Sequence, residues 1–571
     1  MAKPQYSIGD PCPMCSKGIM VKRSGKFGFF MSCDNYKNGC KHTGNCSTGR
    51  GAVQKTAAKA PASHEPKPAR VWSTWQLAAF AWVASVYKHC ILLACAGSGK
   101  TTILEEQVKR IHEHHKTNGL PTPKILVLAF NKNIQLVLAD RISSVLATIK
   151  TLNGYGHGII AKLAKGRLNM DNWKIKNLVN DSIPATGEEG KPTNEERTKR
   201  SAVQDLVALA MCYLQESTEE LQELDARHAI GATPDVIVRT QQILKLLRNY
   251  KEGMPITFDE QLWLPVVLNL PTEQYDYVLG DEVQDWSAVK LALAYKALKP
   301  EGRMIAVGDK NQAIYGFCGA LSDSMEQIQA AQEKNGGSLP LALPVTYRCA
   351  KAIVREAQED VPELLARDDA PEGEVKTIMD TKFPELVKEN DLVLCRVNAP
   401  LVTYCLMLIR SGLKATIMGK DTASWLINFI FKVGSREATT VPQLIEASET
   451  YRHKEQQKFA AMKNPGQAMQ KLDDLLDTLL ALTDGLDTTK QVVDRINTIF
   501  GDENNPGIKL SSIHKAKGLE ADTVYILMPH LMPHPSATQP WELQQEKNLR
   551  YVARTRAKTT LVYVEQTKTG K

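Results

Sequence analysis

A glycine-rich segment follows an apolar run near residue 95 and contains one lysine among small residues. The run ILLAC (91–95) has the character of a buried strand and leads into Ala96-Gly97-Ser98-Gly99-Lys100-Thr101-Thr102, before a helical pattern. Glycines let backbone N–H groups close around phosphate oxygens, and a helix N-terminus adds partial positive charge. Lys100 would reach the β- and γ-phosphates, and the Thr101 hydroxyl would bind Mg²⁺. The segment predicts a phosphate site, although Ala94 stands where the strict pattern G-x-x-x-x-G-K-[ST] begins with glycine.

An acidic pair after another apolar run could complete this site. In YDYVLGDEVQD (275–285), Asp281 and Glu282 stand at the carboxyl end of a predicted strand, which is where open α/β sheets bind ligands. Asp281 would hold Mg²⁺, and Glu282 would orient and deprotonate an attacking water. Such a pair more often marks the start of a helix, but its combination with the glycine-rich segment favours catalysis.

Four cysteines near the N-terminus have the spacing of a metal site. Cys12, Cys15, Cys33 and Cys40 form the pattern C-x2-C-x17-C-x6-C, and four thiolates on two turns suit tetrahedral Zn²⁺. The segment KRSGKFGFFMSC (22–33) between the cysteine pairs predicts a hairpin.

Positive charge and aromatic rings accompany these cysteines. The residues are Lys22, Arg23, Lys26, Phe27, Phe29, Phe30 and Tyr36. This mixture is typical of a surface that binds a single nucleic-acid strand; the alternative is a structural zinc unit with the phenylalanines in its core. His42 and Cys46 are spare, and either could replace Cys40 as a ligand.

Composition and charge fit a large globular protein. The chain has 571 residues, 43% of them hydrophobic, and a net charge of +8, and this length predicts about three to five domains. The mild positive charge permits a nucleic-acid partner without requiring one. We find neither an apolar run of about 18 residues nor an apolar secretory core in MAKPQYSIGDPC, so we expect no membrane association. Without such a signal, clustered cysteines are expected to bind metal rather than form disulfides.

The elements that must position these residues alternate between strands and helices from Val71 onward, which indicates an α/β fold. Apolar runs predict buried parallel strands at ILLAC (91–95), ILVLA (125–129), YVLG (277–280), MIAV (304–307), DLVLC (391–395), TVYIL (523–527) and TLVYV (560–564). Residues of about 160–265 and 435–505 have helical patterns and are predicted insertions.

Further segments surround the acidic pair in a fixed order. They are LAFNKN (128–133), VGDKNQAIYGFCGA (307–320), LPVTYRCA (343–350), SSIHKAKGLEADTVYIL (511–527) and LRYVARTRAKTTLVYVE (549–565). With GSGKTT and DEVQD they resemble the motifs of UvrD/Rep/PcrA-like superfamily 1 DNA helicases over about residues 71–571. LAFNKN is most similar to the F-box DNA helicase group with its phage and bacterial relatives. The resemblance implies two RecA-like parallel-sheet P-loop cores that enclose ATP.

The expected domains follow from the patterns and the resemblance together. They are a zinc-binding module (1–46), a flexible basic linker (47–70), a first core (71–345) with a helical insertion at about 160–265, and a second core (346–571) with a reduced insertion at about 435–505. The linker is rich in Ala, Lys, Pro and Ser, a composition that cannot bury a core.

The resemblance implies contacts to the adenosine part of ATP. Gln76, in STWQ, matches the glutamine that reads adenine, with an ordinary surface helix residue as the alternative. Tyr347 matches the aromatic ring that stacks on adenine. Glu520, in KGLE, matches the residue that contacts the ribose.

It also implies contacts to the transferred phosphate from both cores. Gln312 matches the γ-phosphate sensor, and Arg348 and Arg556 match two arginine fingers. An arginine finger adds positive charge where the transferred phosphoryl group develops negative charge. Because the arginines lie in the second core and Lys100 in the first, the site is complete only when the cores close.

Contacts to single-stranded DNA are implied by motif position. Tyr315 and Phe317 would stack on bases, and Phe130, Asn131, Thr151 and His514 would touch the strand. The alternatives are a core aromatic for Phe317 and a structural histidine for His514.

The chain also departs from the family pattern. Cys318 replaces an arginine found in many relatives, and the stretch from Arg348 to Lys509 is shorter than in UvrD. Processive unwinding by this protein alone is therefore not implied. The cysteine segment resembles the C-terminal zinc modules of type IA topoisomerases, which bind single-stranded DNA.

These observations favour a monomeric 3′-to-5′ DNA helicase that uses ATP, Mg²⁺ and Zn²⁺ and acts on single-stranded DNA and duplex junctions. The polarity comes from the family alone. The alternative is an ATPase stimulated by single-stranded DNA that remodels protein–DNA complexes with little unwinding. A topoisomerase or a fused nuclease is disfavoured, because the sequence offers no residues for either core. Replication or repair proteins are expected partners of the zinc module, in the cytoplasm of a bacterial or phage-infected cell or in a nucleus.

Overall fold

The computed structural model describes residues 71–164, 168–314, 324–433, 440–459, 466–501 and 507–567, and, nearer the N-terminus, residues 5–6, 20–25, 28–33 and 43–46. The chain divides into two compact units, Met1–Trp72 and Ser73–Lys571, which are described separately. Within these ranges, none of the helices combines the length and the apolar character that a membrane crossing requires.

The N-terminal unit contains a four-stranded sheet in the order β1-β4-β3-β2. Its strands are β1 (Gln5–Tyr6), β2 (Met20–Gly25), β3 (Gly28–Cys33) and β4 (Thr43–Cys46). β2 and β3 pair antiparallel, which confirms the predicted hairpin.

The predicted zinc ligands and linker fall largely outside the described residues. Cys33 ends β3, whereas Cys12, Cys15, Cys40 and residues 47–70 are not described. The part of the chain that the structure describes contains no group of three His, Cys, Asp or Glu side chains able to hold a metal ion. The zinc site therefore stays a prediction.

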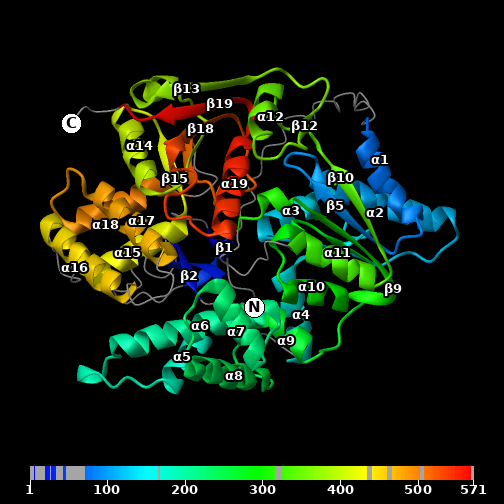
Figure 1. Cartoon of the computed structure of the whole chain (residues 1–571), viewed down its shortest axis with the longest axis horizontal. Coiled ribbons are helices and arrows are strands. Elements are labelled where there is room, and N and C mark those ends of the chain that lie inside the picture. Colours follow the sequence, from blue (N-terminus) through cyan, green and yellow to red (C-terminus); the bar gives the residue numbers. More distant parts are fainter. Residues whose placement is uncertain are drawn as a thin grey trace. The chain divides into compact units, whose positions relative to one another are not determined.

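The first sheet of the larger unit has six parallel strands in the order β10-β5-β9-β8-β6-β7 (Figure 1). The strands are β5 (His89–Ala94), β6 (Ile125–Ala129), β7 (Thr148–Thr151), β8 (Tyr275–Gly280), β9 (Leu298–Gly308) and β10 (Ser338–Leu343). Four predicted apolar runs form β5, β6, β8 and β9. Every residue of β6 is buried, as expected for a parallel strand covered on both faces.

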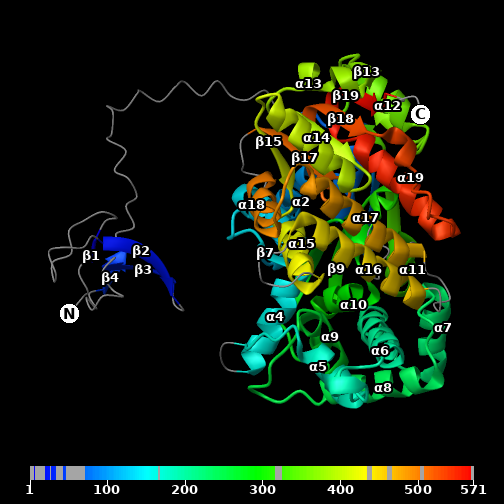
Figure 2. The same ribbon diagram turned by 90° about the vertical axis from the view of Figure 1, so that its left-hand side faces the viewer.

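Helices of this part of the chain connect the strands or extend from them. Helix α1 (Thr74–Ala81) precedes β5, and the connecting helices are α2 (Lys100–Thr117), α3 (Lys132–Arg141), α10 (Ala288–Lys296) and α11 (Ser324–Lys334). Between β7 and β8 come α4 (Leu152–Leu163), α5 (Lys174–Ser182), α6 (Asn194–Tyr213), α7 (Thr218–His228), α8 (Pro234–Arg248) and α9 (Glu260–Val267). Helices α5 to α8 gather at one end of the unit, away from the strands (Figures 1 and 2).

The second sheet is also parallel, with the order β13-β19-β18-β14-β17-β15-β16. Its strands are β13 (Glu374–Met379), β14 (Leu392–Cys395), β15 (Ala415–Met418), β16 (Phe500–Gly501), β17 (Ile508–Ser512), β18 (Ala521–Leu527) and β19 (Ala557–Glu565). The remaining predicted runs form β14, β18 and β19. A short pair, β11 (Val345–Thr346) and β12 (Leu365–Ala366), lies outside both large sheets.

The helices of the second part also divide into those near the sheet and those inserted between two strands. Those near the sheet are α12 (Lys351–Ala357), α13 (Phe383–Leu386), α14 (Ala399–Arg410) and α19 (Pro540–Arg554). Between β15 and β16 lie α15 (Lys420–Val433), α16 (Val441–Phe459), α17 (Gly466–Thr483) and α18 (Thr489–Ile499). The parallel sheets confirm the predicted α/β class, and the domain boundaries at residues 345 and 346 stay an interpretation.

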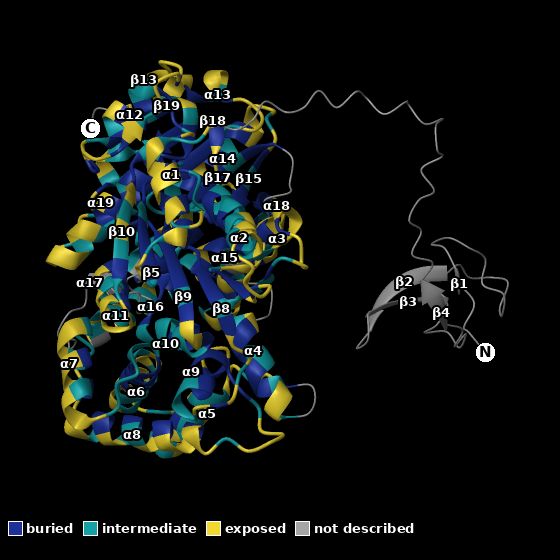
Figure 3. Cartoon of the chain, turned by 90° about the vertical axis from the view of Figure 1, so that its right-hand side faces the viewer, coloured by how far each residue is buried: buried dark blue, intermediate teal, exposed yellow. Residues whose placement is uncertain are grey.

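Some clusters of buried apolar side chains lie within one part of the chain, and another includes residues of both parts. The central strands are buried in both sheets, while the outer faces of the peripheral helices are exposed (Figure 3). A further cluster joins Cys95, Ala96 and Ile314 of the first part to Ile353 and Tyr551 of the second. The glycine-rich segment is therefore packed directly against the second core.

Candidate active site

The glycine-rich segment forms a tight loop between β5 and α2. Gly97 and Gly99 adopt φ angles of +74° and +88°, in the left-handed region that glycine enters without strain. A Cβ atom on Gly97 would lie 2.4 Å from Thr346 Oγ1 and 2.7 Å from Arg348 Cβ. The Tyr347 N–H donates to the Gly97 carbonyl over 2.8 Å. Glycine is thus required because the second core touches the loop backbone.

Other residues of the loop are buried or start the helix. The Ala96 N–H donates to the Tyr551 hydroxyl over 2.8 Å. Ser98 is buried, and its hydroxyl has no hydrogen-bond partner among the described residues. Lys100, Thr101 and Thr102 occupy the first turn of α2, so all three lie at the positive end of the helix dipole.

Lys100 faces the acidic pair that follows β8. Its Nζ lies 3.2 Å from Glu282 Oε1, and both side chains are largely buried. Burial opposes the charge, but Glu282, Asp309 and Asp281 together raise the pKa of Lys100. The structure therefore brings the predicted phosphate-binding lysine and the predicted base into direct contact.

The two acidic residues have opposite electrostatic environments. Burial and the neighbouring Glu282 charge raise the pKa of Asp281. Although burial acts against it, Lys100 and Lys517 hold the pKa of Glu282 below its usual range. Glu282 is therefore the carboxylate that stays ionised in its pair with Lys100. Its φ of +49° is uncommon outside glycine and indicates local strain at a functional position.

Gln312 links this acidic site to the second core. Its Nε2 donates to Asp309 Oδ2 over 2.7 Å, and its Oε1 accepts from Arg556 Nη2 over 3.3 Å. The Asp309 N–H donates to Gln284 Oε1 over 2.9 Å, and Gln284 also donates to Glu282. A continuous set of hydrogen bonds thus connects the DEVQD segment to Arg556.

Arg556 is one of the largest fully buried side chains. Burial and the nearby Arg348 charge lower the pKa of Arg556 to about 9, so it remains a cation at neutral pH. Its Nε donates to the Val552 carbonyl over 2.9 Å, and its Nη1 donates to the Leu519 carbonyl over 3.2 Å. These bonds fix the guanidinium toward the first core.

Arg348 and Glu520 form a second charged group, which belongs to the second core, as Arg556 does. Arg348 Nε lies 2.8 Å from Glu520 Oε2, and Lys558 Nζ lies 2.9 Å from Glu520 Oε1. Arg348 also donates to the Thr555 carbonyl over 3.1 Å. Burial opposes ionisation, but Arg348 and Lys558 lower the pKa of Glu520, so the carboxylate stays available as an acceptor.

The two predicted adenine contacts meet each other. The Tyr347 hydroxyl donates to Gln76 Oε1 over 3.1 Å. Gln76 is buried and forms a capping box with Ser73 at the start of α1, which fixes its side chain. The contacts described above therefore bring predicted nucleotide residues of both cores together where the cores meet.

Predicted strand contacts of the first core lie at the carboxyl edge of its sheet. Ala129 of β6 pairs with Thr151 of β7, so Phe130 and Asn131 lie beside Thr151. Asn131 accepts the Ile134 N–H over 2.9 Å, and Thr151 accepts the Gly154 N–H over 3.0 Å. Both are helix N-caps, at α3 and α4. Tyr315, Phe317 and Cys318 lie outside the described residues.

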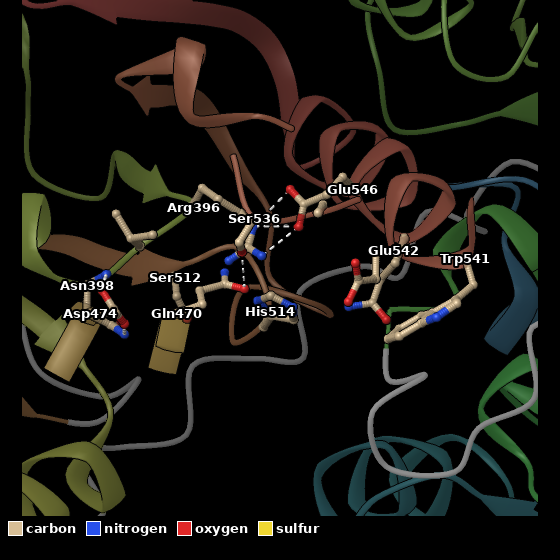
Figure 4. Close-up of a pocket in the computed structure, with 13 residues that line it drawn as sticks. Arg396, Asn398, Gln470, Asp474, Ser512, His514, Ser536, Trp541, Glu542 and Glu546 are labelled. Carbon is tan, nitrogen blue, oxygen red and sulfur yellow. Dashed lines mark hydrogen bonds and ion pairs between the residues drawn. The ribbon is translucent and has the colours of Figure 1, made fainter. Parts of the chain in front are cut away.

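His514 lies apart from these residues, in a cavity of about 220 Å³ (Figure 4). The wall includes Arg396 and Trp541, and also Gln470 and Asp474 of α17. Arg396 is neutralised by Glu546 over 2.6 Å. Burial and Arg396 lower the pKa of His514 to about 3, so its ring is neutral. A neutral imidazole in a cavity that an aromatic ring also lines suits a base better than a phosphate.

Several residues that contribute to the cleft were missed from the sequence. Tyr551 contacts the glycine-rich loop, and Asn548 Nδ2 donates to the Ala313 carbonyl over 2.8 Å. Lys517 Nζ lies 2.5 Å from Asp285 Oδ2. All three stand inside motif segments or next to them: Lys517 lies in HKAKGLE (514–520), Tyr551 lies in LRYVA (549–553), and Asn548 directly precedes it.

Two protein-family models and several known proteins match this chain. Residues 75–333 match the UvrD/REP helicase N-terminal domain, and residues 507–564 match the UvrD-like helicase C-terminal domain. F-box DNA helicase protein 1 of Schizosaccharomyces pombe is 24% identical over 82% of this chain and 54% of its own length.

Bacterial DNA helicases are also similar to this chain, over shorter regions. DNA helicase II of Escherichia coli is 24% identical over 59% of this chain and 48% of its own length. DNA helicase II of Rickettsia typhi is 22% identical over 47% of this chain and 41% of its own length. The chain thus spans about half the length of these relatives.

Proposed function

Taking as premise that the chain carries the N-terminal and C-terminal domains of UvrD-like helicases, we propose that it is an ATP-driven motor that moves on single-stranded DNA and separates strands. One observation carries the proposal. Lys100, Glu282, Gln312 and Arg556 belong to one hydrogen-bonded and ion-paired network that spans the two sheets. A cleft with this arrangement can couple hydrolysis to movement of one core against the other.

The proposed chemistry assigns a separate task to each charged side chain. Lys100 exchanges its contact with Glu282 for the β- and γ-phosphates, which leaves the ionised Glu282 to accept a proton from the attacking water. Arg556 and Arg348 place positive charge beside the phosphoryl group as it transfers. Because both arginines come from the second core, hydrolysis requires a closed cleft.

A magnesium ion fits the donor set beside Lys100. Asp281 offers a buried carboxylate after β8, and Thr101 offers a hydroxyl in the first turn of α2. Hard oxygen donors in this small number are typical of Mg²⁺ sites that share the ion with phosphates. When bound, Mg²⁺ would neutralise phosphate charge. Asp281 and Thr101 would be the residues that hold it.

We assign Gln76 and Tyr347 to adenine and Glu520 to the ribose. The bond between the Tyr347 hydroxyl and Gln76 Oε1 supports this assignment, because the two side chains are adjacent. Arg348 and Lys558 hold the Glu520 carboxylate, which leaves it ionised to accept a hydroxyl hydrogen bond.

The strand is assigned to the carboxyl edges of the sheets, with contacts at Phe130, Asn131, Thr151 and His514. The relatives compared above are DNA helicases, and 3′-to-5′ movement is what the family resemblance implies. Strand separation on duplexes with a 3′ or a 5′ overhang tests both activity and polarity. Unwinding from the 3′ overhang supports the proposal. Stimulated ATP hydrolysis without unwinding would favour the remodelling ATPase instead.

For the N-terminal unit we assign one Zn²⁺ to Cys12, Cys15, Cys33 and Cys40. The donor set supports this, since the two cysteine pairs flank the β2–β3 hairpin in the sequence. Four thiolates match the preference of structural zinc. Metal analysis of the purified chain should give one zinc per molecule, lost when Cys12 and Cys15 are replaced by serine.

A further inference from the structure

Lys517 joins the two cores between the predicted hydrolysis site and the predicted strand contacts. It lies between β17 and β18, and its side chain is 9% exposed. Its Nζ is 2.5 Å from Asp285 Oδ2 and donates to the Gln312 carbonyl over 2.8 Å. Both acceptors belong to the first core, so this ammonium group crosses the cleft.

Asp285 depends on that ammonium group for its charge balance. The carboxylate is 1% exposed, and burial raises the pKa of Asp285 while Lys517 lowers it. Its second oxygen, Oδ1, has no hydrogen-bond partner among the described residues. A buried carboxylate that loses its cation is strongly destabilised. Separation of the cores at this point must therefore hydrate or protonate Asp285.

The same ammonium group reaches the ring of Phe130. Lys517 Nζ lies 5.9 Å from the ring centroid, and Lys290 Nζ lies 5.3 Å from it. Lys290 is itself tied to Asp285, because it donates to the Asp285 carbonyl over 3.0 Å. Phe130 is half-buried, and a cation near an aromatic face is attracted to it.

Through these contacts, a strand bound at Phe130 would act on the proposed phosphate site. A base stacked on Phe130 would cover the ring and the remaining exposed part of the Lys517 side chain. Water could then enter less easily between Lys517 and Asp285, so the buried pair would be held closed. The bond from Lys517 to the Gln312 carbonyl would then hold Gln312, whose side chain accepts from Arg556.

We propose that Lys517 and Asp285 form a buried latch that couples strand binding at Phe130 to closure of the nucleotide cleft. The proposal rests on the proposed function and deepens it, since it names how the strand regulates hydrolysis. Lys517 is a positioning residue: it acts on the phosphate site through Gln312 and on the strand site through Phe130.

The test measures ATP turnover with and without saturating single-stranded DNA in the full chain. Lys517→Met and Asp285→Asn should each reduce the stimulation by strand about tenfold, within the usual range of coupling between two sites. The KM for ATP should change less than the turnover, because neither residue is assigned to the nucleotide. The double variant should be no worse than either single variant, since both changes break one interaction. Lys517→Arg keeps the charge and should restore much of the stimulation.

A matched control separates this role from general destabilisation. Lys174 and Glu260 form a buried pair of the same type, 2.6 Å apart, within the first core. Lys174→Met should lower the melting temperature but leave the stimulation intact. Stimulation that is unchanged in Lys517→Met and Asp285→Asn, with a stimulated wild type, overturns the latch alone. A wild type that is not stimulated at all contradicts the proposed function itself.

Discussion

The proposed nucleotide site and the proposed strand-binding edge use their polar residues differently. In the cleft, side chains far apart in sequence pair with one another: Lys100 with Glu282, and Gln312 with Arg556. At the proposed strand-binding edge, Asn131 and Thr151 cap the helices that follow them directly. The pair of Gln312 with Arg556 brings the two cores together, whereas Asn131 and Thr151 form their bonds within the first core alone. Changes in the cleft should therefore affect turnover, and changes at the edge should affect the strand concentration that the motor needs.

The largest effect is expected for Lys100→Ala. Without the ammonium group the phosphates lose their cation, so ATP turnover should fall by at least about 10³-fold. Steady-state phosphate release measures this. The matched control is Lys109→Ala on the same helix, whose partner is Glu105 at the surface; it should keep wild-type turnover. Normal turnover in Lys100→Ala would remove the glycine-rich loop from the site.

Arg556→Ala should reduce turnover by about 10³-fold, because an arginine finger acts mainly in the transition state. The KM for ATP should change far less. Arg554 is the control: it pairs with Glu356, Glu359 and Asp360 inside the second core. Arg554→Ala should lower the melting temperature and spare the turnover of the folded protein. Equal losses in KM and turnover for Arg556→Ala would argue against a finger.

Glu282→Gln should lower turnover by about 10²-fold, since general base catalysis contributes at least that much. ATP should still bind, because the amide keeps the shape of the side chain and removes a negative charge beside Lys100. Binding of a fluorescent ATP analogue, measured alongside turnover, checks both statements. Loss of binding together with turnover would assign Glu282 a structural role.

Much of the fold could be predicted because the central strands are continuous apolar runs. β6 and β14 are buried along their whole length, which is what a covered parallel strand requires. Two of the strands that were not predicted lie at sheet edges and lack this signal. β7 (TIKT) is half-buried throughout and lies at a sheet edge, and β10 contains Pro340 at the opposite edge. Proline removes a donor from the ladder, so it is tolerated there.

The residues of the candidate site also divide into those that the sequence indicates and those that it does not. Lys100, Glu282 and Arg556 could be predicted as site residues because local motifs specify them. Tyr551 and the pair between Lys517 and Asp285 were not found, because these contacts depend on how two cores pack together. A single sequence does not indicate the distance between residues of different cores. The local capping roles of Asn131 and Thr151 could have been recognised, since Asn and Thr before a helical run are typical N-caps.

At the proposed strand-binding edge the effects should be smaller and of another kind. Phe130→Ala should raise the single-stranded DNA concentration for half-maximal ATPase by about tenfold, in line with the loss of one stacked base. Maximal turnover should fall less. Phe258, exposed before α9, provides the control, and Phe258→Ala should leave the concentration unchanged. A Phe130 variant with wild-type DNA dependence would show that this ring does not contact the strand.

The smallest effect is expected on removal of residues 1–70. Every motor motif lies beyond Val71, so the shortened protein should keep its maximal turnover. A tethered second binding unit raises effective concentration, so its loss should raise the half-maximal DNA concentration. An unchanged DNA dependence would exclude a role in loading the motor on DNA and favour a partner protein for this unit.

The central claim is that strand binding and ATP hydrolysis are coupled through one cleft. Its most direct test is the ATP turnover of the full chain, measured against the concentration of single-stranded oligonucleotides of increasing length. We predict strong stimulation that saturates, with less DNA needed as the strand lengthens. Turnover that is the same with and without DNA at every length would contradict the claim.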